Sequence, residues 1–485
     1  MQSSSVRSRA RSRAHDLVAL PPSARAALLL ASLALPACAS TSAQTSRDLD
    51  GAYDLATQRL AAGPSRAGEA TDPPTYPALD PATYPALDRD ALIALAVARS
   101  PALAAMAHRA RALIHAGRAE RALPSPEVGV QLTNLPLTRP YALGEASMYM
   151  VELQQRFPVA AALDARARAM SEEARAALAE LTTEERMTAQ RAADAFASYV
   201  QGEQERAVEA QQLVLLERMA AAIRARYSTG GAALADAPRL ELELAKTRRA
   251  IARSEGDVAQ ARAALNALLR RASTAPLAVP PESPPETVRL SEDELLRRAD
   301  ANRGTTLAAD ARLRGARARQ AAADAEARVP EFMVGLGYYQ DPQMRPGFGA
   351  TFSMSLPWLW GAQVERSAQA REEIAAELST RDAADVDAHS EISAARARLA
   401  SSENQLAVVN TQALPAARRA IDALSAGYVT GGVTLLEWVD AAREVLEFEL
   451  ERVALSAELA HSLAELERAV GAPLPRVSLT DEERP

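Results

Sequence analysis

The sequence predicts a mainly α-helical fold with a small β part, in which long antiparallel helical hairpins accompany four strands per chain. Three observations predict it: a unit of roughly 200 residues occurs twice, each copy contains stretches of period-two alternation, and each copy contains a helical pattern near 66 residues long without a break. The 485 residues, 48% of them apolar and 24% charged, suffice for a large folded chain. One cysteine excludes an internal disulfide and a thiolate cluster.

Residues 1–37 have the pattern that is typical of an export signal. Arginines precede a short apolar core at 26–35, which is too short to span a bilayer. The segment ends in Leu35-Pro36-Ala37-Cys38, which resembles a bacterial lipobox, so cleavage before Cys38 and lipid attachment to that only cysteine are expected. Ala39 after the cysteine indicates the outer membrane. The open alternative is an ordinary signal with an incidental thiol.

The mature chain is acidic. Removing residues 1–37 takes away five arginines and Asp16, which leaves 50 basic against 61 acidic residues and a net charge of −11. Nucleic acid is therefore an unsuitable partner. Residues 38–89 are rich in Ser, Thr, Pro and Ala and predict an extended, lipid-anchored tether with no buried face. After residue 40 no apolar stretch approaches the roughly 20 residues of a membrane-spanning helix.

Three landmarks recur in order from residue 90 onward. Pro126-Glu127 returns as Pro330-Glu331, Phe157-Pro158 as Leu356-Pro357, and Tyr227–Gly231 as Tyr428–Gly432, at offsets of 204, 199 and 201. Such spacing indicates a tandem duplication. The first repeat spans 90–275, an equatorial linker 276–290, the second repeat 291–475 and a C-terminal tail 476–485.

Each repeat opens with a helical run, 90–122 and 292–328, and then alternates with period two. The predicted strands cover about 127–134, 147–157, 331–340 and 348–357, each with one apolar and one polar face. The apolar faces carry Val128, Val130 and Leu132, then Tyr149, Val151, Leu153 and Phe157, then Phe332, Val334, Leu336 and Tyr338, then Phe348, Ala350, Phe352, Met354 and Leu356. Their lengths match bilayer-crossing strands, and the alternative is a soluble sandwich. Four strands cannot close a barrel alone, so the membrane interpretation requires several chains.

Long helices follow the strands. The patterns over 161–226 and 362–427 correspond to about 100 Å each at 1.5 Å per residue. Each ends at a Tyr-x-Thr-Gly-Gly turn, with tips expected at about 227–233 and 428–434, and helices over 234–270 and 433–470 return. Each returning helix covers only about half the length of the long helix beside it. The full length is covered if 234–270 lies end to end with 292–328, and 433–470 with 90–122. Prolines within 274–287 predict an irregular belt at the join.

These features together resemble the TolC-type outer-membrane efflux duct family over residues 88–475. The resemblance implies a homotrimer whose chains contribute four strands each to a twelve-stranded transmembrane barrel above a periplasmic α-helical barrel. It also implies an inner-membrane efflux pump, and a periplasmic adaptor that docks at the tip. The tip residues are Tyr227, Gly230, Gly231, Tyr428, Gly431 and Gly432. The lipobox is similar to that of lipidated branches of the family, whose anchor lies in outer-membrane lipid.

The resemblance also implies a pore gate. The family carries two acidic residues nine and twelve positions beyond the second tip tyrosine, and Glu437 and Asp440 stand there. Residues three apart share a helix face, so a trimer would place six carboxylates around a narrow opening and favour cations. The alternative for Glu437 is a capping box with Thr434. The family's basic latch residue after this turn is missing, because Val433 stands in that stretch.

No pattern in the sequence indicates an enzyme. The five histidines form no metal-ligand motif, and phosphate-binding loops and a nucleophile elbow are missing from the sequence. We expect no cofactor besides a covalent lipid on Cys38, and no metal site. The competing class is a non-channel, lipid-tethered periplasmic coiled-coil adaptor or scaffold. Two long hairpins, each entered through alternating strands, favour the duct.

Overall fold

The computed structural model describes most of the chain after the signal. The described residues are 39–61, 89–133, 148–228, 236–278, 284–340 and 346–479. They belong to two units, Met1–Ala52 and Tyr53–Pro485, and every element from α4 onward lies in the second. Helix α3, Ala39–Ala61, corrects the expected tether, since this part is helical and buries Tyr53 and Ala56. Residues 39–61 contain no proline, so their composition permits a helix.

The helical run that opens each repeat is broken in two, where one run was expected. The first becomes α4, Arg89–Ala98, and α5, Pro101–Ala119, because Pro101 lacks an N–H and Ser100 caps the new helix by accepting from the Leu103 N–H. The second becomes α8, Glu292–Asn302, and α9, Gly304–Arg328. Gly304 is required there, because an added Cβ would lie 2.2 Å from the Ala179 carbonyl.

The long helices differ between the repeats. In the first, α6 runs unbroken over Ala160–Ser228, 69 residues or about 100 Å. The second was expected to be unbroken too, and this is wrong. Helix α10, Ala362–Val408, passes through a π-turn at Val409–Ala413 into α11, Leu414–Thr430. Pro415 is the reason, since it cannot donate to the carbonyl four residues before it.

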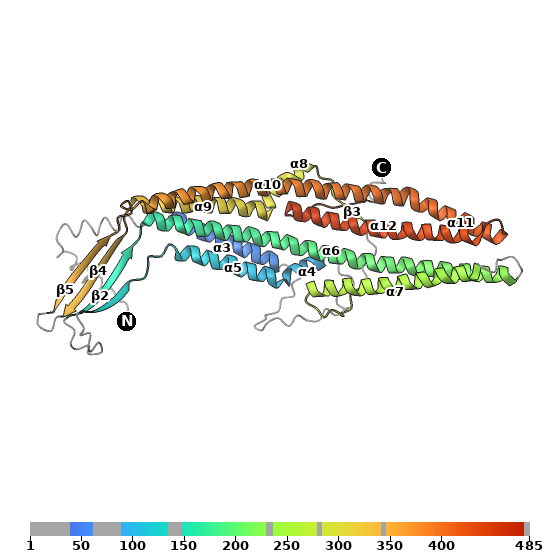
Figure 1. Cartoon of the computed structure of the whole chain (residues 1–485), viewed down its shortest axis with the longest axis horizontal. Helices are drawn as coiled ribbons and strands as arrows, with labels where there is room; N and C mark the ends of the chain where they lie inside the picture. Colours follow the sequence, from blue (N-terminus) through green and yellow to red (C-terminus); the bar gives the residue numbers. More distant parts are fainter. Residues whose placement is uncertain are drawn as a thin grey trace, which may run out of the picture. The chain divides into compact units, whose positions relative to one another are not determined.

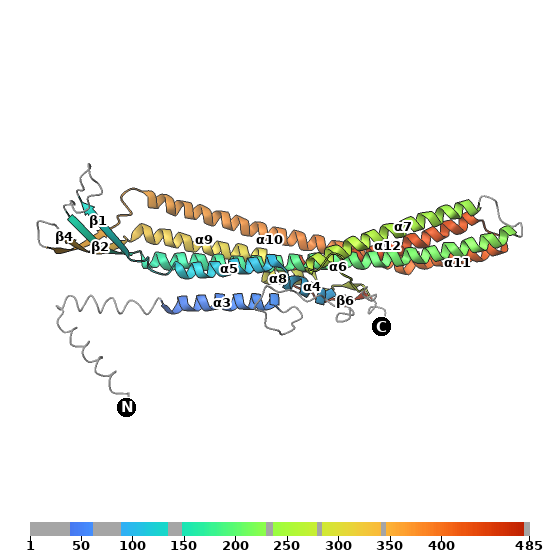
Figure 2. The same ribbon diagram turned by 90° about the horizontal axis from the view of Figure 1, so that it is seen from below.

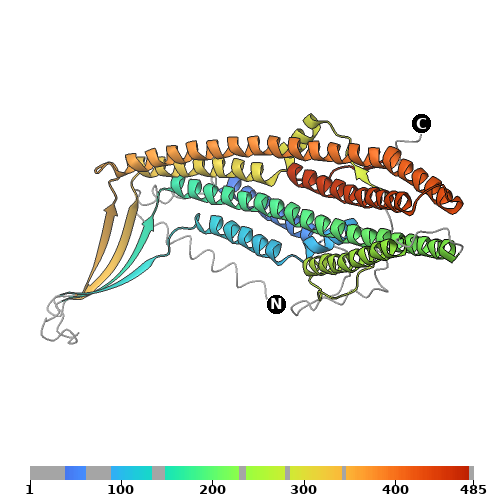
Figure 3. The ribbon, with the colours of Figure 1, turned by 45° about the vertical axis from the view of Figure 1, so that its right-hand side comes forward.

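The returning helices are α7, Asp236–Leu268, and α12, Leu435–Val470. Their contacts revise the expected end-to-end partners. Helix α9 and helix α12 both pack along α10, and Figures 1 and 3 show them in line. Helix α5 is likewise followed by α7 alongside α6. The joins therefore lie within each repeat and do not cross between repeats. Lengths alone could not distinguish the two arrangements, because the candidate helices are similarly long.

Each join is held by a buried arginine from the helix break. Arg99, 8% exposed, donates to the carbonyl of Leu269 at 3.0 Å, and Arg303, 6% exposed, donates to that of Ala469 at 2.8 Å. Both acceptors lie at helix C-termini, where carbonyls lack intrahelical partners and the helix dipole favours a cation. Sequence reasoning did not identify these arginines.

The four predicted strands are present. They are β1, Glu127–Thr133, β2, Met148–Phe157, β4, Phe332–Gln340, and β5, Gly347–Met354. They form one antiparallel sheet in the order β1-β2-β4-β5, which joins the repeats through β2 and β4. The sheet lies at the end of the long helices opposite the tips (Figure 1). Its register aligns Val130, Val151, Tyr338 and Phe348 across all four strands.

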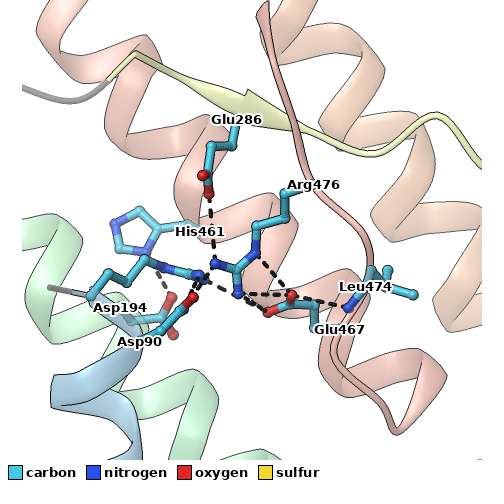
Figure 4. Close-up of polar contacts among 8 residues, drawn as sticks. Asp90, Asp194, Glu286, His461, Glu467, Leu474 and Arg476 are labelled. Atoms are coloured by element: carbon cyan, nitrogen blue, oxygen red, sulfur yellow. Dashed lines mark hydrogen bonds and ion pairs between the residues drawn. The ribbon is translucent and has the colours of Figure 1, made fainter.

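A polar belt lies halfway along the helices. Strand β3, Glu286–Thr287, pairs with β6, Val477–Ser478, so the linker is bonded to the segment after α12. Figure 4 shows Arg476 between three carboxylates: it bonds Asp90 at 2.9 Å and Glu467 at 3.0 Å, and Glu286 lies at 3.6 Å. These residues come from both repeats, the linker and the tail, so the belt ties the chain's parts together.

Hydropathy adds one finding on the described helices. Within that part of the chain no individual helix combines the length and apolar composition of a membrane span, whereas α4 and α5, bent by 50°, meet both criteria as a pair.

Candidate functional site

The tip of the second repeat is a tight turn between α11 and α12. Gly431 adopts φ 86°, the left-handed region that glycine enters without steric cost. Its N–H donates to the Tyr428 carbonyl at 3.2 Å, and the Gly432 N–H donates to the Gly427 carbonyl at 3.0 Å. This pattern is a Schellman ending, which satisfies the last carbonyls of α11. The predicted turn at 428–434 is thus present.

Glu437 completes a capping box at the start of α12. Its carboxylate accepts from the Thr434 N–H and hydroxyl, both at 2.8 Å, and the Glu437 N–H donates to the Thr434 hydroxyl at 3.3 Å. The backbone N–H of Thr434, followed by its hydroxyl, lowers the pKa of Glu437. The side chain is exposed and stays ionised. Capping therefore occupies one side of this carboxylate and leaves its charge at the tip.

Asp440 lies on the same exposed face, one turn further along α12. Its carboxylate accepts from Arg443 at 2.9 Å. Arg443 also reaches across to Glu243 on α7, with Nε to Oε2 at 3.2 Å and Nη2 to Oε1 at 2.5 Å. Hydrogen bonds from Arg443 are the largest cause of a lowered pKa at Glu243, against burial, which raises it. The gate candidate Asp440 thus belongs to a charged network that includes the first repeat.

Beneath these charges the two repeats share an apolar core. We call α6 with α7 the first hairpin and α11 with α12 the second hairpin; Figure 2 shows all four helices gathered at this end. The core draws Leu216, Met219, Ile223 and Leu240 from the first hairpin and Tyr428, Leu435, Trp438, Val439 and Ala442 from the second. The Tyr428 and Trp438 rings lie 5.0 Å apart. This packing fixes the face of α12 that points outward.

The two tip tyrosines, which occupy matching places in the two repeats, have different surroundings. Tyr428 is 2% exposed, whereas Tyr227, in the last turn of α6, is 57% exposed. Arg226 lies between the repeats: its guanidinium stacks on the Tyr428 ring at 4.8 Å and donates to the Tyr428 carbonyl. Gly230 and Gly231 lie outside the described residues, as does Cys38.

Two parts of the tip network were missed by sequence reasoning. Arg443 follows Asp440 by three residues, a spacing that predicts an ion pair on one helix and so could have been found. The contact of Arg443 with Glu243 and that of Arg226 with Tyr428 join residues about 200 positions apart. Only the packing of the hairpins reveals them.

The sheet presents a second candidate surface. Its predicted apolar face is exposed: Val130 is 69% exposed, Leu336 64%, Phe348 84% and Phe352 67%. The opposite face carries glycines and polar side chains, among them the buried Glu152. Among the described strands, β1 and β5 each have a single neighbour. A contiguous apolar face with two open edges marks an interaction surface.

Long helical hairpins that carry a small sheet are also found in known proteins. Residues 295–472 match the family described as Outer membrane efflux protein. No curated protein matches the chain.

Solved structures match over most of the chain. A membrane protein from Pseudomonas aeruginosa has 20% identity and a TM-score of 0.67, over 84% of this chain and 100% of that one. The outer membrane protein VceC from Vibrio cholerae has 18% identity and a TM-score of 0.66, over 80% and 97%. The open state of the MtrE outer membrane channel from Neisseria gonorrhoeae has 19% and 0.65, over 80% and 89%.

The resemblance to the TolC-type family is thereby confirmed. Residues 295–472, within the second repeat, match the Outer membrane efflux protein family, and the chain shares the fold of these solved structures: mainly helical, with a few strands.

Proposed function

We propose that this protein is the passive outer-membrane exit duct of a tripartite efflux system. It receives substrate from an inner-membrane pump through a periplasmic adaptor and releases it outside the cell. The observation that carries the proposal is the four-stranded sheet, because its apolar face is exposed and both its edges are open. Three copies pooling four strands each would close a twelve-stranded barrel, remove the edges and turn the apolar face to lipid.

The helices support the same assignment. A 69-residue helix gives a reach of about 100 Å below the sheet, and no enzyme chemistry requires such a length. The tips, with the exposed Tyr227, are where the adaptor would dock. A lipid on Cys38 would tether the mature N-terminus to the outer membrane. The adaptor or scaffold alternative leaves the exposed apolar sheet without a role.

The gate belongs to this proposal as well. Glu437 and Asp440 are both exposed and share a face of α12, so three copies would bring six carboxylates together. The capping role of Glu437 and its gate role are compatible, since the cap uses the ionised form. Cations would be favoured and anions resisted.

The central experiment is migration of the outer-membrane fraction on a gel with and without heating. A duct is expected to require detergent for extraction, to migrate as a trimer unheated and to become monomeric on boiling. Release without detergent as a monomer would refute the duct. Radiolabelled palmitate should enter the wild-type chain and be absent from Cys38→Ser.

The gate is tested by ion selectivity in planar bilayers. Replacing both acids, Glu437→Gln with Asp440→Asn, is expected to shift the reversal potential in a salt gradient toward that of a non-selective pore. The control is Thr434→Ala, which removes the cap hydroxyl and leaves both charges in place. Equal shifts in the two variants would contradict the gate, because loss of the cap alone would then account for the change.

A further inference from the structure

One carboxylate lies in a row of glycines on the polar face of the sheet. The register places Glu152 on β2 between Gly129 on β1 and Gly337 on β4, and it pairs Gly337 with Gly349 on β5. Of the four residues in this row, only Glu152 has a side chain. A glycine inside a strand weakens the strand, and it often marks a place where a ligand approaches closely. The row is therefore a candidate binding site.

The carboxylate of Glu152 lies over another glycine of β4, Gly335. A Cβ on Gly335 would lie 2.4 Å from Oε1 of Glu152 and 3.3 Å from Cγ of Gln154. A Cβ on Gly337, by contrast, would meet the side chain of Met150 first, at 3.7 Å. The lack of a side chain at Gly335 therefore makes the room that the carboxylate occupies.

This carboxylate is buried without a donor at one of its oxygens. Glu152 is 8% exposed, and its Oε1 has no hydrogen-bond partner among the residues that the structure describes. The other buried acids in the described part of the chain, Glu185, Glu209 and Glu243, each accept a hydrogen bond from a side chain. An ionised carboxylate removed from water requires a cation or donors in place of the water. Glu152 therefore has a position open for a cation.

The site forms only where the two repeats meet. Glu152 belongs to the first repeat and Gly335 to the second, and β2 pairs with β4. The offset of 199 places Thr351 at the position that corresponds to Glu152, and the offset of 204 places Gln131 at the position that corresponds to Gly335. The first repeat thus supplies the acid, and the second supplies the room for it.

We infer that Glu152, with the glycines beside it, is a cation-binding site in the wall of the pore, at the opposite end of the long helices from the tips (Figure 1). The inference rests on the proposed function, in which this polar face lines the lumen and three chains place three such sites at one level. The ligand is a small monovalent cation, because each chain supplies one carboxylate, whereas Ca²⁺ and Mg²⁺ take about six or more oxygen ligands. Weak binding suits a pore, since the ion must also leave.

A binding site differs from an exposed charge in its response to salt. The Debye length is about 10 Å at about 0.1 M salt and about 3 Å at about 1 M, so an exposed carboxylate attracts cations mainly in dilute salt. A cation held against a buried carboxylate is screened much less. The cation selectivity that Glu152 provides should therefore persist in concentrated salt.

The experiment measures reversal potentials of the full-length protein in planar lipid bilayers, under potassium chloride gradients in the dilute and the concentrated range. Glu152→Gln removes the charge at nearly the same volume, so the ratio of potassium to chloride permeability should fall about fivefold in both ranges, the factor expected for one ion pair in contact with water. Gly335→Ala keeps the acid but fills its room. Its permeability ratio should equal the wild type in dilute salt and fall as far as that of Glu152→Gln in concentrated salt.

The matched control is Gly337→Ala, two residues further along the same face of β4. A Cβ there makes only ordinary van der Waals contacts and leaves the Glu152 carboxylate in place. Its permeability ratio should equal the wild type in both salt ranges. The tip acids Glu437 and Asp440 are unchanged in every variant, so differences between variants arise in the sheet.

Assembly of each variant is checked by unheated gel migration, and Gly335→Ala carries the test if Glu152→Gln does not assemble. A wild-type permeability ratio in Glu152→Gln would mean that no cation binds there, and it overturns the site. A wild-type ratio in Gly335→Ala in concentrated salt overturns it too, because Glu152 would then act as an ordinary exposed charge. A wild-type protein that forms no channel refutes the duct instead.

Discussion

The two joins between stacked helices offer a comparison inside one chain. In each, an arginine at a helix break donates to a backbone carbonyl at the C-terminal end of the helix that lies in line with it. Arg99 donates to the Leu269 carbonyl, and Arg303 donates to the Ala469 carbonyl. In each, a left-handed residue lies just beyond the end of the partner helix: Arg270, two residues after α7, with φ 54°, and Gly471, directly after α12, with φ 81°. The same backbone path is thus built once with a costly residue and once with the permissive one.

The space available explains the difference. A Cβ on Gly471 would lie 2.7 Å from the Cα of Arg303 and 2.8 Å from the carbonyl oxygen of Asn302, both of them backbone atoms. Arg270 is exposed, so its side chain has room. The second join is the tighter one, and its arginine also pairs with Glu391 on α10 at 3.1 Å. Duplication therefore preserved the hydrogen bonds and let the packing diverge.

The strongest way to break the second join is Arg303→Ala. It leaves the Ala469 carbonyl without its side-chain donor and leaves Glu391 with Arg468 as its remaining partner. We therefore expect a loss of about 3 kcal/mol in the free energy of unfolding. Thermal unfolding followed by circular dichroism measures it. Arg297→Ala is the control, because Arg297 is exposed and its pair with Glu294 lies on one helix, and it should cost less than about 0.5 kcal/mol. Equal losses would contradict the role of the join.

Gly471→Ala tests the tightness of that join. The left-handed backbone and the contact with Arg303 together should cost about 2–3 kcal/mol. The same unfolding measurement applies, with Gly256→Ala as a control, since a Cβ at Gly256 meets no atom within 4 Å. A stable Gly471→Ala variant would mean that the backbone there relaxes freely.

Arg270→Gly probes the first join in the opposite direction. Removing the side chain relieves the left-handed strain and should stabilise the protein by about 1 kcal/mol. A higher unfolding temperature than the wild type is the expected result. A lower temperature would mean that the contacts of the Arg270 side chain outweigh the strain.

The smallest expected effect concerns a single hydrogen bond between the two repeats and its dependence on pH. His461 on α12 bonds Asp194 on α6 at 2.8 Å, and this hydrogen bond raises its pKa above the ordinary value near 6.5. The stabilisation is therefore complete below about pH 6.5 and is lost as pH rises through the folded-state pKa. We expect about 1 kcal/mol or less. Unfolding temperatures against pH measure it, and Asp194→Asn should flatten this dependence.

Much of the fold was predictable because its signals are local. Alternation placed the strands and their faces, and the glycine-marked turn placed the second tip, since Gly431 needs a positive φ. The helix breaks at Pro101 and Pro415 were also visible in the sequence, because proline interrupts a helix. The long helical pattern around each proline nevertheless favoured an unbroken helix. Contacts between repeats carried none: Arg443 gives no local hint that Glu243 lies beside it, and equal helix lengths concealed which ends meet.

The pairing of β3 with β6 has a consequence for how the chain matures. Strand β3 precedes the second repeat and its partner follows it, so a nascent polypeptide must carry β3 unsatisfied while all of α8 to α12 is being synthesised. Closing so large a loop is an entropically late step. The polar belt should consequently be the last region to gain protection from hydrogen exchange, after the first and second hairpins have formed.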